Sequence, residues 1–209
     1  MNYSAIIPCG GVGSRLNLGY NKILYKINNS YLIEKTIKNF LLDEDCQEII
    51  IVYQKDYLNI LNNLFKHPKI KLTIGGDSRE ESVYNGLKIA SSEYVLIHDG
   101  ARPNITKELI NRIKNKLKDC DYVIPVVKCK DASLLNGEYH FNEISLIQTP
   151  QATKKMLLKE AMENVNLKNF KDDISIISFY YKVSPFVVEG DYNNIKITTK
   201  EDLKYIKED

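Results

Sequence analysis

The feature that most constrains the fold is a regular alternation of apolar, β-type runs with helical patterns between residues 3 and 127. Residues 48–53 read EIIIVY, a continuous β-branched run typical of a strand that is buried on both faces. Comparable runs lie at residues 5–7, 70–74, 94–98 and 122–127. Strands that alternate with helices predict an α/β fold: a Rossmann-like, mostly parallel sheet with helices on both faces.

The stretches between these runs place apolar residues at helical spacing. Helices are predicted at residues 32–41, 56–65, 80–90, 106–117, 154–162 and 173–181, with a strand at 186–189 and a last helix from Thr199. Residues 21–27 are expected to be extended, and Ser30 to cap the helix that follows. Around Asn136-Gly137 the alternation stops, and residues 132–144 predict a projecting β-hairpin. We expect one domain over residues 1–209.

A glycine-rich loop follows the first predicted strand. Residues 8–16 read PCGGVGSRL, and Lys22 comes shortly after. Glycines let backbone amides approach an anion closely, and an arginine with a lysine would neutralise a polyphosphate. The loop matches neither the P-loop pattern, because it lacks Gly-Lys-Ser/Thr, nor the dinucleotide fingerprint, because Leu16 occupies the third glycine position. The pattern alone fits either a phosphate loop or an ordinary glycine-rich turn.

Two more polar loops follow predicted strands, at residues 75–82 and 99–103. In a parallel sheet, ligands bind beyond the carboxyl ends of strands, so these loops and residues 8–16 are expected to share one edge. The helix after residue 78 would direct its N-terminal amides there. Asp99 at a strand end is a candidate Mg²⁺ ligand, because hard cations take carboxylate and phosphate oxygens together. A turn-forming Asp99 paired with Arg102 is the alternative.

Composition restricts the partners. With 29 Lys and Arg against 27 Asp and Glu, the net charge of +2 gives no reason to expect nucleic acid or an anionic membrane surface. No apolar run approaches 18 residues, and no leader pattern is visible at residue 1. Four scattered cysteines without CxxC spacing favour free thiols over a zinc site or disulfides. We therefore expect a soluble, cytoplasmic protein.

Five sequence blocks together carry a family resemblance. They are residues 10–15 (GGVGSR) with Lys22, residues 75–79 (GGDSR) with Ser82, residues 98–103 (HDGARP), residues 149–151 (TPQ) and residues 194–198 (NIKIT). In this order, and over nearly the whole chain, they resemble the 2-C-methyl-D-erythritol 4-phosphate cytidylyltransferases. More broadly, they resemble the polyol-phosphate cytidylyltransferases, which include the ribitol 5-phosphate enzymes.

The resemblance implies that a polyol phosphate attacks the α-phosphorus of CTP and displaces pyrophosphate, with Mg²⁺ as cofactor. It implies catalytic roles for Arg15, Lys22 and Lys196. Arg15 and Lys22 would stabilise charge on the triphosphate and the transition state, and Lys196 would face the incoming polyol phosphate. The nucleotide-binding set it implies is Cys9, Gly10, Gly11, Gly13, Gly76, Asp77, Ser82 and Gly100. Asp99, Arg102 and Thr149 would contact the acceptor, with Asp99 also binding the metal. Without the resemblance, Lys196 reads as a solvated lysine and Thr149 as a turn residue.

The segment 131–149 departs from the family. The resemblance implies that this β-arm crosses a homodimer and grips the acceptor with a threonine and an arginine, but Ala132 and Phe141 stand at those positions. A later Thr-Asp-Glu block is replaced by residues 171–173, Lys-Asp-Asp. Losing an arginine–phosphate contact is not a conservative change. Lys128, Lys130 or Lys171 are candidate replacements.

The acceptor is therefore the open question. Methylerythritol phosphate, an isoprenoid precursor, is favoured by Gly100-Ala101 in the central block. Ribitol 5-phosphate or another polyol phosphate, for a surface polymer, is the alternative. A third reading is a nucleotide-binding relative without catalytic activity, which intact Arg15, Lys22 and Lys196 disfavour.

Overall fold

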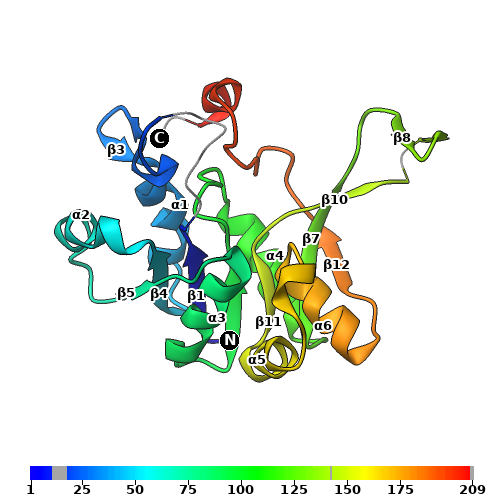
Figure 1. Cartoon of the computed structure of the whole chain (residues 1–209), viewed down its shortest axis with the longest axis horizontal. Coiled ribbons are helices and arrows are strands. Elements are labelled where there is room, and N and C mark those ends of the chain that lie inside the picture. The colour runs from blue at the N-terminus through cyan, green and yellow to red at the C-terminus, as the bar shows by residue number, and fades with distance from the viewer. Residues whose placement is uncertain (11–17, 142, 208–209) are drawn as a thin grey trace.

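The fold is a twisted central sheet covered by helices on both faces, with one ribbon that projects from the body (Figure 1). A computed structural model describes residues 1–10, 18–141 and 143–207. The sheet strands are β1 (Tyr3–Pro8), β4 (Cys46–Tyr53), β5 (Ile70–Ile74), β6 (Tyr94–Ile97), β7 (Tyr122–Lys128), β10 (Ser145–Ile147), β11 (Gln151–Lys154) and β12 (Phe186–Glu189). Two small hairpins pair β2 (Lys26–Ile27) with β3 (Ser30–Tyr31), and β8 (Ser133–Leu135) with β9 (Glu138–His140).

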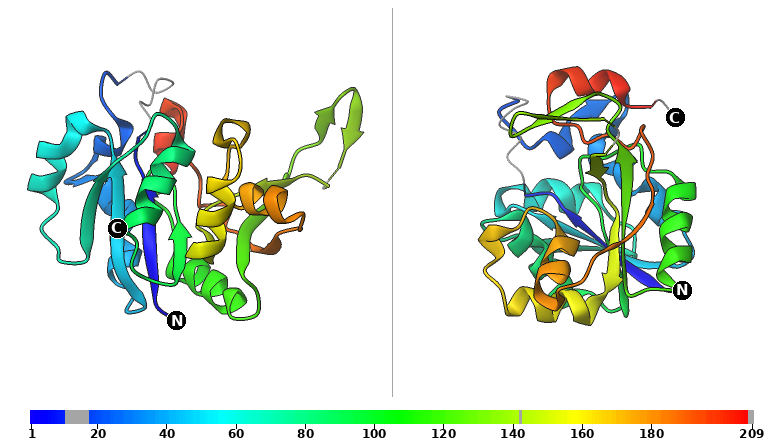
Figure 2. Two further views of the ribbon diagram at one scale, coloured as in Figure 1. Left: turned by 60° about the horizontal axis from the view of Figure 1, so that its bottom comes forward. Right: turned by 90° about the vertical axis from the view of Figure 1, so that its right-hand side faces the viewer.

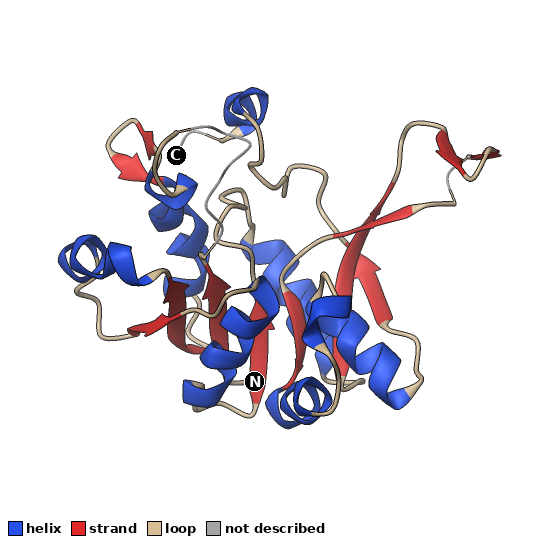
Figure 3. Ribbon diagram, viewed as in Figure 1, coloured by secondary structure: helices blue, strands red, loops and turns tan. Residues whose placement is uncertain are grey.

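Helices connect the strands in the predicted order (Figure 3). The α-helices are α1 (Leu32–Leu41), α2 (Leu58–Leu64), α3 (Arg79–Ile89), α4 (Lys107–Leu117), α5 (Lys155–Glu163) and α6 (Asp173–Tyr181). Short 3₁₀ helices are η2 (Lys22–Leu24), η3 (Lys55–Tyr57), η4 (Leu167–Asn169) and η5 (Lys200–Tyr205). The last of these is the helix predicted from Thr199; Asp202 accepts the backbone N–H groups of Thr198 and Thr199 at its start.

Strand β1 lies at the point where the chain order in the sheet reverses. It pairs in parallel with β4 on one side and with β6 on the other, and β5 continues in parallel beyond β4. Side chains of β4 alternate between two cores, as a strand buried on both faces requires. Ile49 and Ile51 face the layer formed by α1, α2 and α4, whereas Ile50 and Val52 face α3, α5 and α6. The mostly parallel α/β sheet predicted from the sequence is confirmed.

Sequence reasoning missed two strands of the main sheet, β10 and β11. Strand β11 lies antiparallel between β6 and β7. It has only four residues, QATK, and its buried positions include Gln151 and Thr153, so no apolar alternation marks it. Position in the fold, rather than hydrophobic pattern, makes these residues a strand.

Two local predictions were wrong. Residues 22–24 form a 3₁₀ turn instead of extended chain, because the Asn21 side chain accepts the backbone N–H of Ile23 and caps the turn. The turn buries Ile23 and Leu24. Ser30 does not cap α1. It lies in β3, and the carboxylate of Glu34 instead accepts the backbone N–H of Tyr31 at 2.7 Å.

The projecting ribbon is the predicted hairpin. Asn136 and Gly137 both have positive φ, 51° and 87°, which is the requirement of the two-residue turn that their sequence predicts. The ribbon extends away from the rest of the molecule in Figure 1 and in the left-hand view of Figure 2. It carries exposed apolar side chains, which are Leu134, Leu135, Tyr139 and Phe141.

Candidate functional site

The strand-end loops predicted to meet do meet, around one cavity of about 770 Å³. It lies beyond the carboxyl ends of β1, β5 and β6, where the order of the sheet reverses, which is the usual ligand site of such sheets. Its described lining is Pro8, Cys9, Gly10, Asn21, Lys22, Ile23, Gln54, Lys55, Ile74, Gly75, Gly76, Asp77, Ser78, Arg79, Ser82, Asp99, Gly100, Ala101, Lys196 and Thr198. Arg15, Gly11 and Gly13, which the sequence placed here, lie outside the described residues.

The 75–82 loop is held closed by its own side chains. Ser82 Oγ accepts the backbone N–H of Gly76 at 3.1 Å, and Glu81 accepts that of Asp77 at 2.8 Å. A Cβ at position 76 would lie 2.4 Å from Cβ of Glu81, so the turn has room only for glycine. The loop therefore presents backbone, rather than side chain, to the cavity at Gly75 and Gly76.

Cys9 and Gly100 pack together at the floor of the cavity. A Cβ on Gly100 would lie 2.6 Å from the Cys9 sulfur, so glycine is needed for the two loops to approach. Cys9 is buried, and burial raises the pKa of its thiol. The thiol is thus protonated, and we assign this residue to packing beneath the site rather than to chemistry.

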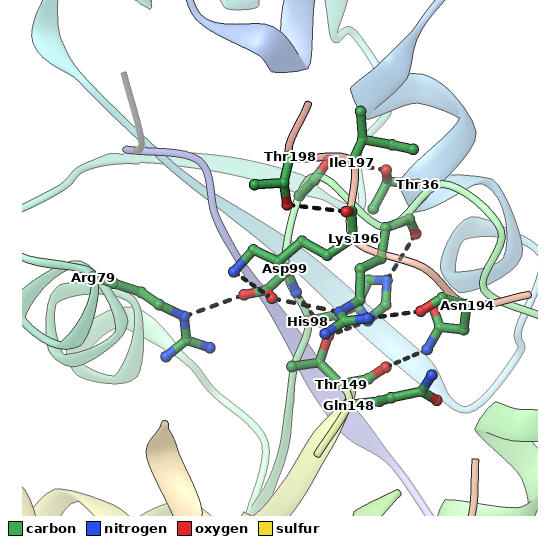
Figure 4. A network of polar contacts seen from close by, with 12 residues as sticks. Thr36, Arg79, His98, Asp99, Gln148, Thr149, Asn194, Lys196, Ile197 and Thr198 are labelled. Atoms are coloured by element: carbon green, nitrogen blue, oxygen red, sulfur yellow. Dashed lines mark hydrogen bonds and ion pairs between the residues drawn. The ribbon is translucent and has the colours of Figure 1, made fainter. Parts of the chain in front are cut away.

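Asp99 is the centre of the charged part of the site (Figure 4). One carboxylate oxygen lies 3.2 Å from Arg79 Nε, and the other lies 2.9 Å from Lys196 Nζ and 3.5 Å from Arg102 Nε. Burial alone would raise the pKa of Asp99, but the charges of Arg79, Lys196 and Arg102 outweigh it and hold the pKa well below its usual range. Asp99 is therefore ionised, and three cations surround one anion.

Arg79, the last residue of the GGDSR block, bridges two carboxylates, and its sequence position alone predicted no role for it. Besides Asp99, its terminal nitrogens donate to both oxygens of Asp173, at 3.0 and 2.8 Å. Asp173 is fully buried at the start of α6, and burial raises its pKa although Arg79 opposes the shift. The signal that could have found this pair is the scarcity of arginine: four in 209 residues, one of them next to the 75–78 loop.

Lys22 and Lys196 come from opposite ends of the chain to the same cavity. Lys22 Nζ donates to the carbonyl of Ile197 at 2.8 Å, and the N–H of Ile197 donates to the carbonyl of Ala101 at 2.8 Å. These contacts fasten the segment that carries Lys196 onto the loop that carries Asp99. Lys22, Asp99 and Lys196 thus line one cavity, and the roles expected for them stay predictions.

Arg102 and Thr149 lie behind this wall; neither is among the described cavity-lining residues. Arg102 donates from Nη1 to the carbonyl of Asn194 at 2.7 Å, and burial lowers its pKa. Thr149 is 4% exposed, and its hydroxyl contacts the backbone N–H of Asp99 and the ring of His98. The contact with acceptor that the resemblance implies for these two residues stays a prediction.

Two aspartates, Asp77 and Asp99, line the described part of the cavity and set what a metal ion could use. Within the described part of the chain, no group of three or more His, Cys, Asp or Glu is placed to hold one. Mg²⁺ commonly takes one or two carboxylates and completes its shell with phosphate and water. Asp99 fits that mode, with most ligands coming from a bound polyphosphate. Among the same residues, no helix has the length and apolar character of a membrane span.

Several known proteins resemble this chain over nearly its whole length. The family model described as "IspD: 2-C-methyl-D-erythritol 4-phosphate cytidylyltransferase" matches residues 3–207. A curated enzyme of that name from Geobacillus kaustophilus is 37% identical, over 98% of this chain and 95% of its own. A 4-diphosphocytidyl-2C-methyl-D-erythritol synthase from Anaerococcus prevotii superposes with a TM-score of 0.84 at 32% identity, covering 98% and 96% of the two chains. The bifunctional IspDF of Campylobacter jejuni superposes with a TM-score of 0.88 at 31% identity, over 99% of this chain and 55% of that longer one.

Proposed function

The chain belongs to the 2-C-methyl-D-erythritol 4-phosphate cytidylyltransferase family, and on that premise we propose how its residues share the work of the reaction. The protein is a CTP-dependent nucleotidyltransferase. It transfers CMP from CTP to 2-C-methyl-D-erythritol 4-phosphate, which gives the CDP-polyol and pyrophosphate in non-mevalonate isoprenoid precursor synthesis. The observation that carries the assignment of roles is the meeting of three strand-end loops around Asp99 and its cations.

The reaction sets a clear electrostatic task. An oxygen of the acceptor phosphate forms a bond to the α-phosphorus of CTP, and the bond from that phosphorus to the bridging oxygen of pyrophosphate breaks. Both reactants are anions, so the protein must bring like charges together and stabilise the charge of the five-coordinate transition state. Positioning and cations suffice for this, and a covalent protein nucleophile is not needed.

On the nucleotide side, we assign the cytidine to the 75–82 loop. Gly76, Asp77 and Ser82 would contact the base and the ribose, since the loop presents an exposed backbone at Gly76 and an exposed carboxylate at Asp77. The backbone of Gly10 would face the triphosphate, with Gly11, Gly13 and Arg15 of the same loop. Lys22, on the cavity wall, would neutralise phosphate charge.

On the acceptor side, we assign Lys196 and Arg102. Lys196 is exposed, and its ammonium lies on the cavity wall 2.9 Å from Asp99. An incoming phosphate would compete with Asp99 for this cation, so Asp99 holds Lys196 in place until substrate binds. Arg102 lies 3.5 Å from the same carboxylate oxygen of Asp99 and adds positive charge from behind the wall.

We propose Mg²⁺ as the cofactor, held by Asp99 together with phosphate oxygens. The ion would supply charge neutralisation on the triphosphate. Asp99 is suited to this because it is ionised and directed to the cavity. Its three cationic neighbours would be shared with the phosphates of the bound substrates.

We further propose a homodimer built through the 131–149 arm. The exposed apolar side chains of the arm are Leu134, Leu135, Tyr139, Phe141, Leu146 and Ile147. Lys130, at the arm's base, lies with its ammonium 4.1 Å from the centroid of the Tyr192 ring, and it stays a candidate, with Lys128 and Lys171, for the role of the missing arm arginine. Sedimentation should give twice the 24.1 kDa chain mass; a mass of one chain at micromolar concentration contradicts the dimer. Four free cysteines and the soluble substrates favour a cytoplasmic location.

The test of substrate is pyrophosphate release from CTP and Mg²⁺, with methylerythritol phosphate and ribitol 5-phosphate in parallel. We expect turnover with methylerythritol phosphate. The ribitol phosphate alternative has one observation in its favour, Phe141 in place of the arm arginine. Release with ribitol phosphate alone would replace the main assignment, and CTP binding without release for any acceptor would indicate a non-catalytic relative.

A further inference from the structure

His98 follows strand β6 directly and sits beneath the site. Its ring is fully buried and lies 5.4 Å from the ring of Phe40, centroid to centroid. Ring nitrogen Nε2 lies 3.1 Å from the carbonyl oxygen of Arg102, and Nδ1 lies 3.0 Å from the hydroxyl of Thr149. The ring thus joins two residues that flank Asp99, and the proposed chemistry gives it no task.

The partners fix the direction of each hydrogen bond. A carbonyl oxygen only accepts, so Nε2 carries the proton and donates to Arg102. Nδ1 of the uncharged ring then presents a lone pair, and the Thr149 hydroxyl donates its one proton to it. A backbone N–H only donates, so that of Asp99, 3.1 Å away, donates to the same hydroxyl oxygen. The result is a one-way chain from Asp99 through Thr149 and His98 to Arg102.

Asn194 closes the arrangement from the other side (Figure 4). Its side-chain amide donates to the carbonyl of Thr149 at 2.7 Å, and its own carbonyl accepts from Arg102 Nη1 at 2.7 Å. Asn194 is fully buried, as is His98. Both ends of the acceptor side, the Asp99 backbone and the Arg102 guanidinium, are therefore fixed to the same Thr149.

We propose that His98 and Thr149 are positioning residues, which hold Asp99 and Arg102 in place through this chain of hydrogen bonds. The inference rests on the roles proposed above for Asp99, which holds Lys196 and the metal ion, and for Arg102 on the acceptor side. It assigns Thr149 a different task from direct contact with the acceptor: its only hydroxyl proton is used inside the protein, and its side chain is buried. Reactive geometry is sensitive to such support, because small displacements of charged groups cost large factors in rate.

Kinetics of four variants test the proposal. Thr149→Val should lower kcat/KM for methylerythritol phosphate about 10- to 100-fold, the equivalent of losing one or two buried hydrogen bonds, and leave the dissociation constant of CTP within about twofold. Thr149→Ser keeps the hydroxyl and should recover most of the loss. Thr153→Val is the matched control: it removes a buried hydroxyl four residues later, in β11, which is bonded to the carbonyls of Asp121 and Lys154. Equal losses in Thr149→Val and Thr153→Val would overturn the proposal.

A double variant separates positioning from direct contact. His98→Leu removes both ring nitrogens at similar volume and should cost about as much as Thr149→Val. If the two act through one chain, the double variant loses little more than either single variant. If Thr149 touched the acceptor itself, the two losses would multiply, and that result rejects the proposal.

The tautomer can be read without activity. In ¹⁵N-histidine spectra of the full chain, three histidines are present, and His98 is assigned by its absence from His98→Leu. We expect Nε2 protonated and Nδ1 unprotonated; the reverse tautomer overturns the chain of bonds, whatever the enzyme turns over. Absence of turnover by the unmutated enzyme would instead reject the proposed function, while the spectrum still decides the tautomer.

Discussion

The ion pair of Arg79 and Asp173 gives the sharpest test of how the site is held. Asp173 is fully buried, and both its oxygens accept from the Arg79 guanidinium, at 3.0 and 2.8 Å. Asp173→Asn keeps the shape but removes the charge, and its amide nitrogen opposes one of the two donors. A hydrogen bond to a charged group contributes about 1.5–3 kcal/mol, and removing one partner of a buried pair costs about 3–5 kcal/mol. We expect a loss of about 3 kcal/mol in the free energy of unfolding.

For a chain of this size, that loss corresponds to a fall of about 6–12 °C in melting temperature, measured by calorimetry. The matched control is Asp172→Asn, the same change one residue earlier. Asp172 caps α6 by accepting the N–H of Ser175 at 3.0 Å, and asparagine caps a helix as well as aspartate does. This control should change the free energy of unfolding by less than about 0.5 kcal/mol.

A double-variant comparison removes the remaining ambiguity. In an Arg79→Met background the guanidinium is absent, so Asp173→Asn should cost at least 2 kcal/mol less than it does with Arg79 present. The reasoning is refuted if Asp173→Asn and Asp172→Asn melt together, or if the cost of Asp173→Asn is unchanged by removing Arg79. Either result would mean that the buried pair contributes little beyond its own desolvation.

Three further predictions concern other parts of the molecule. Lys22→Ala should lower turnover about 100-fold or more with an unchanged melting profile. The control Lys26→Ala, which removes an exposed lysine stacked on Tyr31, should keep nearly the activity of the unmutated enzyme. Near-normal turnover of Lys22→Ala would contradict the role of Lys22. Burial alone would raise the pKa of Glu48, but hydrogen bonds from Lys71, Ser4 and Ser91 outweigh burial and lower the pKa to about 2. The ionised carboxylate therefore stabilises the fold fully above about pH 4.5. That stabilisation, about 3 kcal/mol, is lost as the pH falls to 2. Urea unfolding between pH 5 and 2.5 should therefore show a smaller acid loss in Glu48→Gln, and parallel curves would exclude the effect. Gly86→Ala should lower the free energy of unfolding by about 1–2 kcal/mol in denaturant titrations, since the new Cβ would lie 2.6 Å from Ile6 Cγ2. An unchanged midpoint would show that α3 can move away from β1.

The sequence predicts the sheet well because its central strands are buried on both faces. The apolar run at residues 48–53 is explained by a strand buried on both faces, and β4 contains all of it. The 136–137 turn is equally clear, because few sequences other than Asn-Gly accept two consecutive positive φ angles. Strand β11 lies outside this logic: Gln151 and Thr153 are buried only because β6 and β7 lie on either side of them.

The candidate site divides in the same way. Loops that follow strands can be placed by topology, so Lys22, Asp99 and the 75–82 loop were expected at one cavity. Among the partners of those groups, the sequence suggested only the pairing of Asp99 with Arg102, three residues away. Arg79 and Asp173 are 94 residues apart, and their pairing depends on how α3 and α6 pack over one face of the sheet. Sequence supplies the groups, and side-chain packing decides which of them are used internally.

The connection between arm and site lies in the pairing of residues 145–154 with β7. Leu146 pairs with Val127 of β7, and Ala152 pairs with Val123 of the same strand. Six residues of the 145–154 segment therefore span four residues of β7, and the part with Thr149 bulges out by two residues between β10 and β11. The arm joins the sheet just before this bulge. Its tip, formed by β8 and β9, projects away from the body (Figure 1), whereas Ser145, where β10 begins to pair with β7, is only four residues before Thr149. Tip residues such as Phe141 can therefore diverge among relatives at little cost to the fold, but insertions or deletions between residues 145 and 151 would displace the acceptor side directly. We expect the sequence changes that alter the partner or the acceptor to accumulate in the outer arm, before Ser145, and to be rare in the segment that follows Ser145.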